Sequence, residues 1–373
     1  MVLKAEQHGL RPVKSGFGFD VAAAERALRD QWAAHASSSE EALLRERALN
    51  LLVIVEGADS LERAQAALEE LMVSHPCRAL CLVLLPDAPA RTTETYVAAR
   101  CALAQGKSEA ATRRHLCGEQ IVLVASADAQ LELISAAAAL VSSDLPTFAW
   151  WRAEPCLDGE FFARLSEMCD RIILDLAMAR DAKRHLRAIA RLVPTLEETA
   201  ITDLEWTRTL DWRASLAECY DVAHGREAIQ CAQHIKITCV PRHNMNLVPQ
   251  AALLAGWLIS RLEWRVDEQQ RQILAPSGAV RFSFDRQQET ARVEPGSLTS
   301  IEFEAESGAK LSLRLTPDGE HIETVASESV IGRTIRCTDR SETCLLQREL
   351  TELARDAIYE RAVVATSAIC DLY

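Results

Sequence analysis

Between residues 48 and 195 short apolar runs alternate with amphipathic stretches, and no other feature of this sequence constrains its fold as strongly. Residues 49–55 are apolar and β-rich, as a strand buried on both faces requires, and a helical spacing of apolar residues follows them. The order of strand and helix then recurs, except that two strands predicted at 93–102 and 120–125 are joined by a hairpin-like loop around 106–108. This pattern predicts an α/β domain with a layered, mostly parallel sheet and one antiparallel excursion.

The pattern changes after Pro194. Residues 272–326 alternate apolar and polar side chains between glycine-containing turns, which predicts an antiparallel sheet with one face in water. The other elements expected in this half are a strand at 230–240 and helices at 206–223, 247–262 and 342–369. We therefore predict a C-terminal domain of the α+β class.

The domain boundaries follow from these patterns. Residues 1–40 comprise a loose arm, up to about residue 19, and a helix that Asp20 caps. Residues 41–195 form the α/β domain, which opens with a helical stretch at 40–47, and residues 196–373 form the α+β domain.

Composition excludes several classes of partner. The net charge of −13 argues against nucleic acid, which proteins bind mainly through Lys and Arg. No run of 18 apolar residues is present, so we expect no membrane span. The N-terminus has no apolar segment of the secretory type, which indicates a cytoplasmic protein whose 12 cysteines are mostly free thiols.

The sequence offers little catalytic chemistry. A dinucleotide site needs a glycine-rich turn after the first strand, but residues 55–60 hold one glycine and two acids, Glu56 and Asp59, which would repel a pyrophosphate. His234 and Cys239 are close in sequence to His243, but in a strand the first two point to opposite faces, which disfavours a shared metal site. We predict no catalytic residue, no cofactor and no metal.

Tryptophan and arginine occur together at several places. Trp and Arg dominate the binding energy of many protein interfaces. The residues that we predict to bind a protein partner are Trp150, Trp151, Arg152, Trp206, Arg208, Trp212 and Arg213. Since neighbouring residues of a strand face opposite sides, one of Trp150 and Trp151 is expected in the core and the other at the interface. For Trp257 a place in the core is favoured over one in an interface.

Several of these segments resemble one protein family. The sequences LPTFAWWR at 145–152, DLEWTR at 203–208 with Trp212-Arg213, and LLAGWLISRL at 253–262 are similar to the glucose-6-phosphate dehydrogenase assembly protein (OpcA) family. The strand at 47–55 and the segment CGEQI at 117–121 also resemble it, so the similarity extends from about residue 45 to 265.

The resemblance implies a non-catalytic protein that binds glucose-6-phosphate dehydrogenase, the first enzyme of the oxidative pentose phosphate pathway, and promotes its active oligomer. It also implies that thioredoxin could act on cysteines, as in cyanobacterial members. The alternative is a divergent α/β enzyme or binding protein that acts on a sugar phosphate or nucleotide through backbone amides at strand ends.

Cys337 and Cys344 are the predicted redox pair. They lie in a polar stretch before the last helix, whereas Cys81 and Cys239 lie in apolar runs. Arg336 and Arg340 are close in sequence, and Cys344 falls in the first turn of that helix, and both features lower a thiol pKa. Asp339 and Glu342 act in the opposite direction, so we expect a small lowering. Two unpaired surface thiols are an equally good interpretation.

Overall fold

The computed structural model describes residues 9–13, 18–38, 43–45, 47–103, 115–242, 247–267, 269–288, 292–325 and 332–370. The chain divides into two compact units. Unit 1 contains Met1–Leu174, Glu198–Ile201 and Ser341–Ala354, and unit 2 contains Asp175–Glu197, Thr202–Arg340 and Arg355–Tyr373. Within the described ranges, no helix is both long and apolar enough to cross a membrane.

The sheet of unit 1 is a doubly wound sheet. Its strands lie in the order β1-β5-β6-β4-β3-β7-β8-β9, and β2 pairs with β6. Strands β6, β4, β3, β7 and β8 are parallel, whereas β1 and β5 are antiparallel to their neighbours. The strands are β1 (Arg11–Val13), β2 (Leu43–Arg45), β3 (Leu49–Glu56), β4 (Cys77–Leu85), β5 (Thr93–Leu103), β6 (His115–Ser126), β7 (Thr147–Arg152), β8 (Arg171–Leu174) and β9 (Ala200–Asp203).

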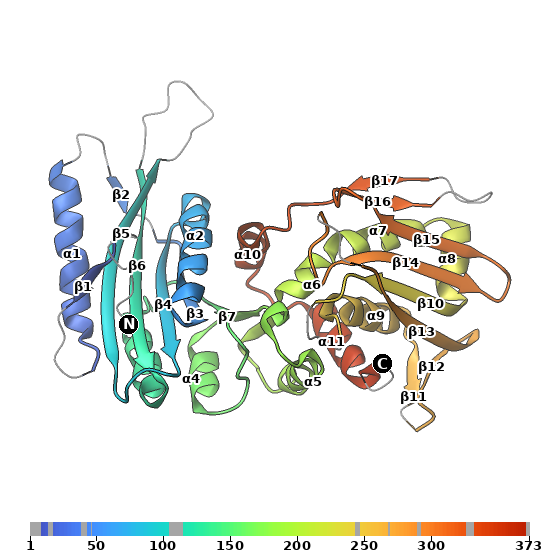
Figure 1. Ribbon diagram of the computed structural model, residues 1–373, viewed down its shortest axis with the longest axis horizontal. Coiled ribbons are helices and arrows are strands. Elements are labelled where there is room, and N and C mark those ends of the chain that lie inside the picture. Colours follow the sequence, from blue (N-terminus) through green and yellow to red (C-terminus); the bar gives the residue numbers. More distant parts are fainter. Residues whose placement is uncertain are drawn as a thin grey trace, which may run out of the picture. The chain divides into compact units, whose positions relative to one another are not determined.

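Helices cover both faces of this sheet, which explains why β3 and β4 are apolar along nearly their whole length. α1 and α2 lie on opposite sides of the strands β5, β6 and β4 (Figure 1). As expected, the Asp20 side chain caps α1, accepting a hydrogen bond from the Ala23 backbone N–H at 2.8 Å. The helices are α1 (Val21–Ser38), α2 (Ala58–Ser74), α3 (Gln130–Leu140), α4 (Glu160–Met168) and α10 (Glu342–Thr351), with a short 3-10 helix η2 (Ala127–Ala129).

The sheet of unit 2 has the order β11-β12-β13-β10-β14-β15-β16-β17. All of its neighbouring strands are antiparallel except β10 and β13, which are parallel. The strands are β10 (Ala232–Cys239), β11 (Arg265–Asp267), β12 (Gln272–Ala275), β13 (Gly278–Arg286), β14 (Leu298–Ala305), β15 (Lys310–Leu315), β16 (His321–Thr324) and β17 (Thr334–Arg336).

The core of unit 2 lies between one face of this sheet and helices. Ile235 and Ile237 of β10 point into it, whereas Lys236 between them is half-buried on the other face. The helices are η3 (Leu176–Met178), α5 (Ala182–Leu192), α6 (Leu204–Arg208), α7 (Leu210–Tyr220), α8 (Ala223–Gln230), α9 (Pro249–Arg261) and α11 (Ala357–Ile369). The fold class predicted for both halves is confirmed. The boundary predicted at residue 195 stays a prediction.

Two predicted elements differ in the structure. The helix predicted at 40–47 is wrong, because Leu43–Arg45 form β2 and pair in parallel with His115–Cys117. The single helix predicted at 342–369 is two helices, α10 in unit 1 and α11 in unit 2. The helix is interrupted because Asp356 caps the start of α11, where its side chain accepts hydrogen bonds from the N–H groups of Ile358 and Tyr359. The loop predicted at 106–108 lies outside the described residues.

Gly256 allows α9 and α11 to approach closely. A Cβ atom on Gly256 would lie 2.0 Å from Thr366 Oγ1 and 2.4 Å from the Ala362 carbonyl oxygen. Both distances are far shorter than any real contact, and the second atom belongs to the backbone, which a side-chain rotation cannot move. The glycine in the LLAGWLISRL segment is therefore required for helix packing.

We predict that Gly256→Ala destabilises the protein by about 1–3 kcal/mol or more, because an added methyl group overpacks the helix contact. In an ordinary helix interior the same change would stabilise by about 0.5–1 kcal/mol. Urea unfolding measures the difference, and Ser260→Ala on the same helix is the control. A rise in the urea midpoint of Gly256→Ala would contradict the close packing.

Candidate functional site

Trp150 and Trp151 are both buried in β7. Trp150 is 0% exposed and Trp151 is 2% exposed. In this conformation neither side chain reaches the surface, where one of them was expected to face an interface. Trp151 packs against Phe161 and Phe162 of α4, at ring-centroid distances of 5.9 and 6.3 Å. The reason is the position of β7 between β3 and β8, where a sheet covered on both faces buries both side-chain directions.

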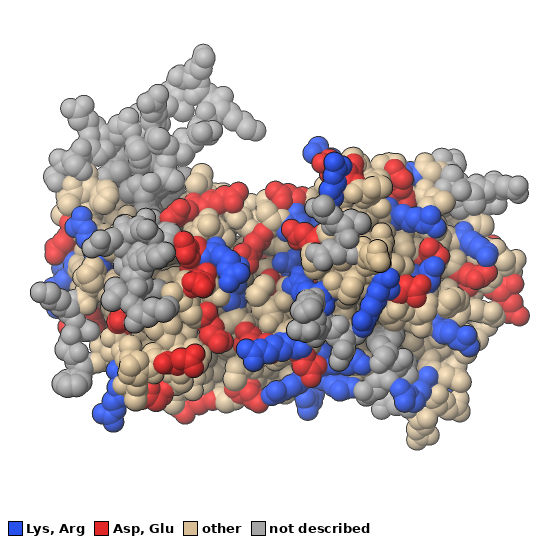
Figure 2. Space-filling model, in the orientation of Figure 1, with Lys and Arg blue, Asp and Glu red and all other residues tan. Residues whose placement is uncertain are grey.

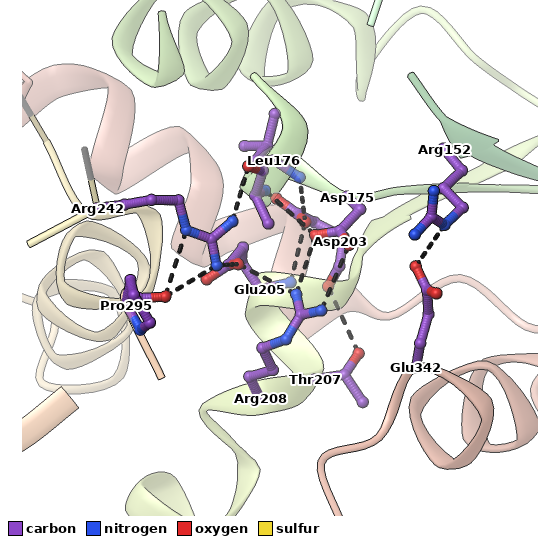
Figure 3. A network of polar contacts seen from close by, with 11 residues as sticks. Arg152, Asp175, Leu176, Asp203, Glu205, Thr207, Arg208, Arg242, Pro295 and Glu342 are labelled. Atoms are coloured by element: carbon purple, nitrogen blue, oxygen red, sulfur yellow. Dashed lines mark hydrogen bonds and ion pairs between the residues drawn. The ribbon is translucent and has the colours of Figure 1, made fainter. Parts of the chain in front are cut away.

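Arg152 at the end of β7 is held within unit 1 by α10. Its Nε donates to Glu342 Oε1 at 2.7 Å, and the Arg152 side chain is only 8% exposed (Figure 3). Arg171 of β8 forms a second pair, Nη1 to Glu349 Oε2 at 3.1 Å. Arg152 and Arg171 lie on the same face of the sheet, so α10 covers that face.

The DLEWTR segment forms a buried cluster of charges in unit 2. Arg208 Nη1 lies 2.9 Å from Asp175 Oδ1 and 3.1 Å from Glu205 Oε1, and both carboxylates are 1% exposed (Figure 3). Arg242 Nη2 lies 3.9 Å from the same Glu205 oxygen and also donates to the Pro295 carbonyl oxygen at 3.0 Å. Burial alone would lower the pKa of Arg208, but Asp175 and Glu205 raise it well beyond its ordinary value.

Asp203 has a different environment from Asp175. It is fully buried, and its Oδ1 accepts hydrogen bonds from the N–H groups of Leu176 at 3.1 Å and Glu205 at 3.0 Å. Burial, and then the negative charges of Glu205 and Asp175, raise the pKa of Asp203 well above its ordinary value. Asp203 thus favours the neutral form, and burial raises the pKa of Glu205 as well, although Arg208 acts in the opposite direction there.

Trp206 of α6 contacts the start of α11 within unit 2. Its indole Nε1 donates to Asp356 Oδ2 at 2.9 Å, and its ring lies 5.7 Å from that of Tyr359. The guanidinium carbon of Arg213 lies 3.4 Å from the centroid of the Trp206 ring, a cation–π contact. This segment therefore positions the first turn of α11.

Two further tryptophans, Trp212 and Trp257, are also packed into unit 2. Trp212 is completely buried, and Trp257 is half-buried against the same core. Of the predicted partner-binding residues, Arg208 and Arg213 are half-buried and the remaining five are buried. Partner binding by these residues stays a prediction, and in this conformation their contacts are made inside the protein.

Cys337 and Cys344 belong to different units, because the boundary falls between Arg340 and Ser341. Cys337 Sγ accepts a hydrogen bond from Arg340 Nη2 at 3.2 Å. Burial raises the pKa of the Cys337 thiol despite the opposing effect of Arg340, so the expectation of a lowered pKa is wrong for this residue. Cys344 lies in the first turn of α10, as predicted, where its backbone N–H donates to Ser341 Oγ at 3.4 Å.

His234 and Cys239 are engaged in separate contacts. The His234 ring is 3.0 Å from Ser283 Oγ, and Cys239 Sγ is 3.7 Å from the Asp285 carbonyl oxygen. His243 lies outside the described residues.

A set of basic residues that lies on α5 and directly before it was not identified from the sequence. Its members are Arg180, Lys183, Arg184, Arg187 and Arg191. Their spacing of three and four residues, on a predicted helix, was the signal that could have found them.

The two halves of the chain match two family models. Residues 68–191 match the N-terminal domain of the glucose-6-phosphate dehydrogenase subunit family, and residues 199–363 match the C-terminal domain of the same family. Both matches are to domains of one kind of two-domain protein, in the order in which they occur here. The chain belongs to the OpcA family of glucose-6-phosphate dehydrogenase assembly proteins.

Relatives with the same family name are moderately similar. A Nostoc punctiforme protein named "Putative OxPP cycle protein OpcA" is 28% identical over 197 residues, which are 53% of this chain and 40% of the relative. A Synechocystis protein of the same name is 25% identical over 324 residues, which are 82% of this chain and 66% of the relative. Among solved structures, a mutant of the 3-ketoreductase KijD10 from Actinomadura kijaniata has a TM-score of 0.48 and 10% identity, covering 87% of this chain and 96% of its own.

Replacement of Asp by Asn is predicted to have opposite effects on the stability of the protein at Asp203 and at Asp175. Because the pKa of Asp203 is higher in the folded than in the unfolded protein, its stabilising contribution is complete below the unfolded-state pKa of about 4 and is lost as pH rises through the folded-state pKa. Asp203→Asn resembles the neutral acid and can still cap α6. We expect its free energy of unfolding at neutral pH to equal or exceed that of the wild type, with a weaker pH dependence.

Asp175→Asn is the matched variant. It removes a charge that pairs with the buried Arg208, and we expect a loss of about 3 kcal/mol. Urea unfolding between about pH 5 and about pH 8, where proteins tend to be most stable, tests both variants. Equal destabilisation by the two substitutions would show that Asp203 is ionised and paired like Asp175.

Proposed function

We propose that this chain is a non-catalytic assembly factor that binds glucose-6-phosphate dehydrogenase and favours its active oligomer, and so supports the oxidative pentose phosphate pathway. The observation that carries the proposal is the match of both halves of the chain to domains described as those of a glucose-6-phosphate dehydrogenase subunit. The names of the two relatives, which refer to the OxPP cycle, support the same pathway.

The chemistry at the strand ends of unit 1 supports a non-catalytic role. In doubly wound sheets, ligands bind where the strand order reverses, which here is between β3 and β7. The turn after β3 carries the exposed acids Glu56 and Asp59, and Asp59 lies in the first turn of α2, where a pyrophosphate would otherwise be attracted. At the end of β7, Arg152 is already paired with Glu342. This arrangement is unsuited to a dinucleotide.

Activation by such a protein follows from linkage. A partner that binds the active oligomer more tightly than the inactive form must shift the population towards the active form. A coupling of about 1–3 kcal/mol would change the apparent substrate affinity of the dehydrogenase roughly 5- to 150-fold.

The experiment is a comparison of dehydrogenase activity and oligomeric state with and without this chain. We expect co-elution in size-exclusion chromatography, a larger dehydrogenase oligomer and a lower apparent KM for glucose 6-phosphate. The chain alone should not reduce NADP. Separate elution with unchanged KM would refute the proposal, and NADP reduction by the chain alone would favour the divergent enzyme.

We further propose that Cys337 and Cys344 form a disulfide that thioredoxin can reduce. The segment between them crosses from unit 2 to unit 1, so the bond would close a loop of six intervening residues at the boundary. The supporting observations are the Arg340 guanidinium beside Cys337 Sγ and the position of Cys344 in the first turn of α10, whereas the raised pKa of the Cys337 thiol opposes its reaction.

Mass spectrometry after mild oxidation tests the pair, with Cys344→Ser as the control. In the oxidised wild type we expect two peptides linked by a disulfide, which thioredoxin reduces. We also expect oxidised and reduced protein to differ in their activation of the dehydrogenase. Absence of the linked peptide, or equal activation by oxidised and reduced protein, would exclude a switch at these two residues.

A further inference from the structure

The turn between β15 and β16 brings three metal-ligating side chains of unit 2 together. Asp318, Glu320 and His321 each offer one ligand atom, and these three atoms lie within 4.8 Å of one another. Two of the atoms are carboxylate oxygens and the third is a ring nitrogen of His321. In the part of the chain that the structure describes, no other three histidine, cysteine or acidic side chains come together in this way.

Hydrogen bonds hold the backbone of this turn in one conformation. The Asp318 carboxylate accepts hydrogen bonds from Thr316 Oγ1 at 2.5 Å and from the Glu320 backbone N–H at 2.9 Å. The His321 carbonyl oxygen accepts one from the Thr316 N–H at 2.8 Å, and His321 pairs with Arg336 of β17. Since the backbone is fixed, the three side chains need only rotate about their own bonds to bind one ion.

Two of the three groups have no partner elsewhere among the described residues. Neither the Glu320 carboxylate nor the His321 ring forms a hydrogen bond or ion pair there. By contrast, Glu302 of β14 is paired with Lys236 at 3.1 Å. Acidic and basic side chains are interspersed over the visible strands of unit 2 (Figure 2), so a cation at the turn is held by direct ligands and not by a broad acidic surface.

The types of ligand indicate which ions fit. Carboxylate oxygens suit magnesium, calcium and manganese, whereas imidazole suits zinc, nickel, copper and iron. Zinc binds imidazole nitrogen and carboxylate oxygen at about 2.0–2.2 Å, and three protein ligands leave a fourth position for water. Tetrahedral ligands at these distances lie about 3.4 Å apart. Rotation of the side chains can bring ligand atoms to that separation from within 4.8 Å.

We propose that Asp318, Glu320 and His321 bind a divalent transition-metal ion of the zinc class. Zinc binding there would correct the sequence-based prediction of no metal. The proposal does not depend on binding of the dehydrogenase, because all three ligands belong to one turn of unit 2.

Titration of the full, reduced chain with cobalt(II), a coloured substitute for zinc, tests the site. Cobalt absorption distinguishes nitrogen and oxygen ligands from thiolates, which is necessary because the chain has 12 cysteines. We expect one saturable site without thiolate-to-metal absorption, from which zinc displaces cobalt. Glu320→Gln with His321→Gln should weaken binding by more than about 100-fold, because two direct ligands are lost and loss of an outer-shell contact alone costs about 10- to 100-fold.

The matched control is Glu323→Gln with His224→Gln, which makes the same changes of residue type and net charge elsewhere in unit 2. It should leave the cobalt affinity unchanged, and thermal melting verifies that both double variants are folded. Absence of a saturable site in the wild type, or equal weakening by the two double variants, would overturn the proposal. Thiolate-type absorption at the saturable site would also overturn it, since cysteines would then hold the ion.

Discussion

The pairing of Arg208 with Asp175 and Glu205 inside unit 2 is the constraint on which the arrangement around the DLEWTR segment depends. Buried charges are tolerated only when they are paired and hydrogen-bonded, so these side chains fix one another's positions. Asp203 accepts one hydrogen bond from the backbone of η3 and one from that of α6, and Trp206 donates one to the cap of α11. One short segment thereby positions η3, α6 and α11. We conclude that the segment organises the interior of unit 2.

A comparable arrangement in unit 1 joins residues that are far apart in sequence. Arg152 and Glu342 are 190 positions apart, and Arg171 and Glu349 are 178 apart. Both pairs attach α10 to the sheet, and α10 also buries Leu345, Leu346 and Leu350. The face of β7 and β8 that the crossover helices leave open is therefore covered by a late segment of the chain. Unit 1 depends on residues 341–354 for its complete core.

The sequence predicted the parts of the fold that depend on local patterns. Buried parallel strands such as β3 and β4 are apolar along nearly their whole length, and this signal does not depend on distant residues. Burial of Trp151 and Arg152 was not predictable in the same way, because it depends on α4 and on Glu342. The strand β2 was missed for a similar reason, since its pairing with β6 outweighs its local helical pattern. Adjacent Trp and Arg residues therefore indicated tightly packed positions, and the sequence could not distinguish a core from an interface.

The central proposal of this account is that the chain binds glucose-6-phosphate dehydrogenase, and the burial of β7 and α6 favours binding through other, exposed segments over the predicted binding through the tryptophan–arginine residues. Hydrogen–deuterium exchange of the chain with and without saturating dehydrogenase tests this most directly. The account predicts new protection at exposed segments, and unchanged, slow exchange in β7 and α6. Absence of new protection anywhere in the chain would contradict the claim of binding, and faster exchange or new protection in β7 and α6 would contradict the internal role of these segments.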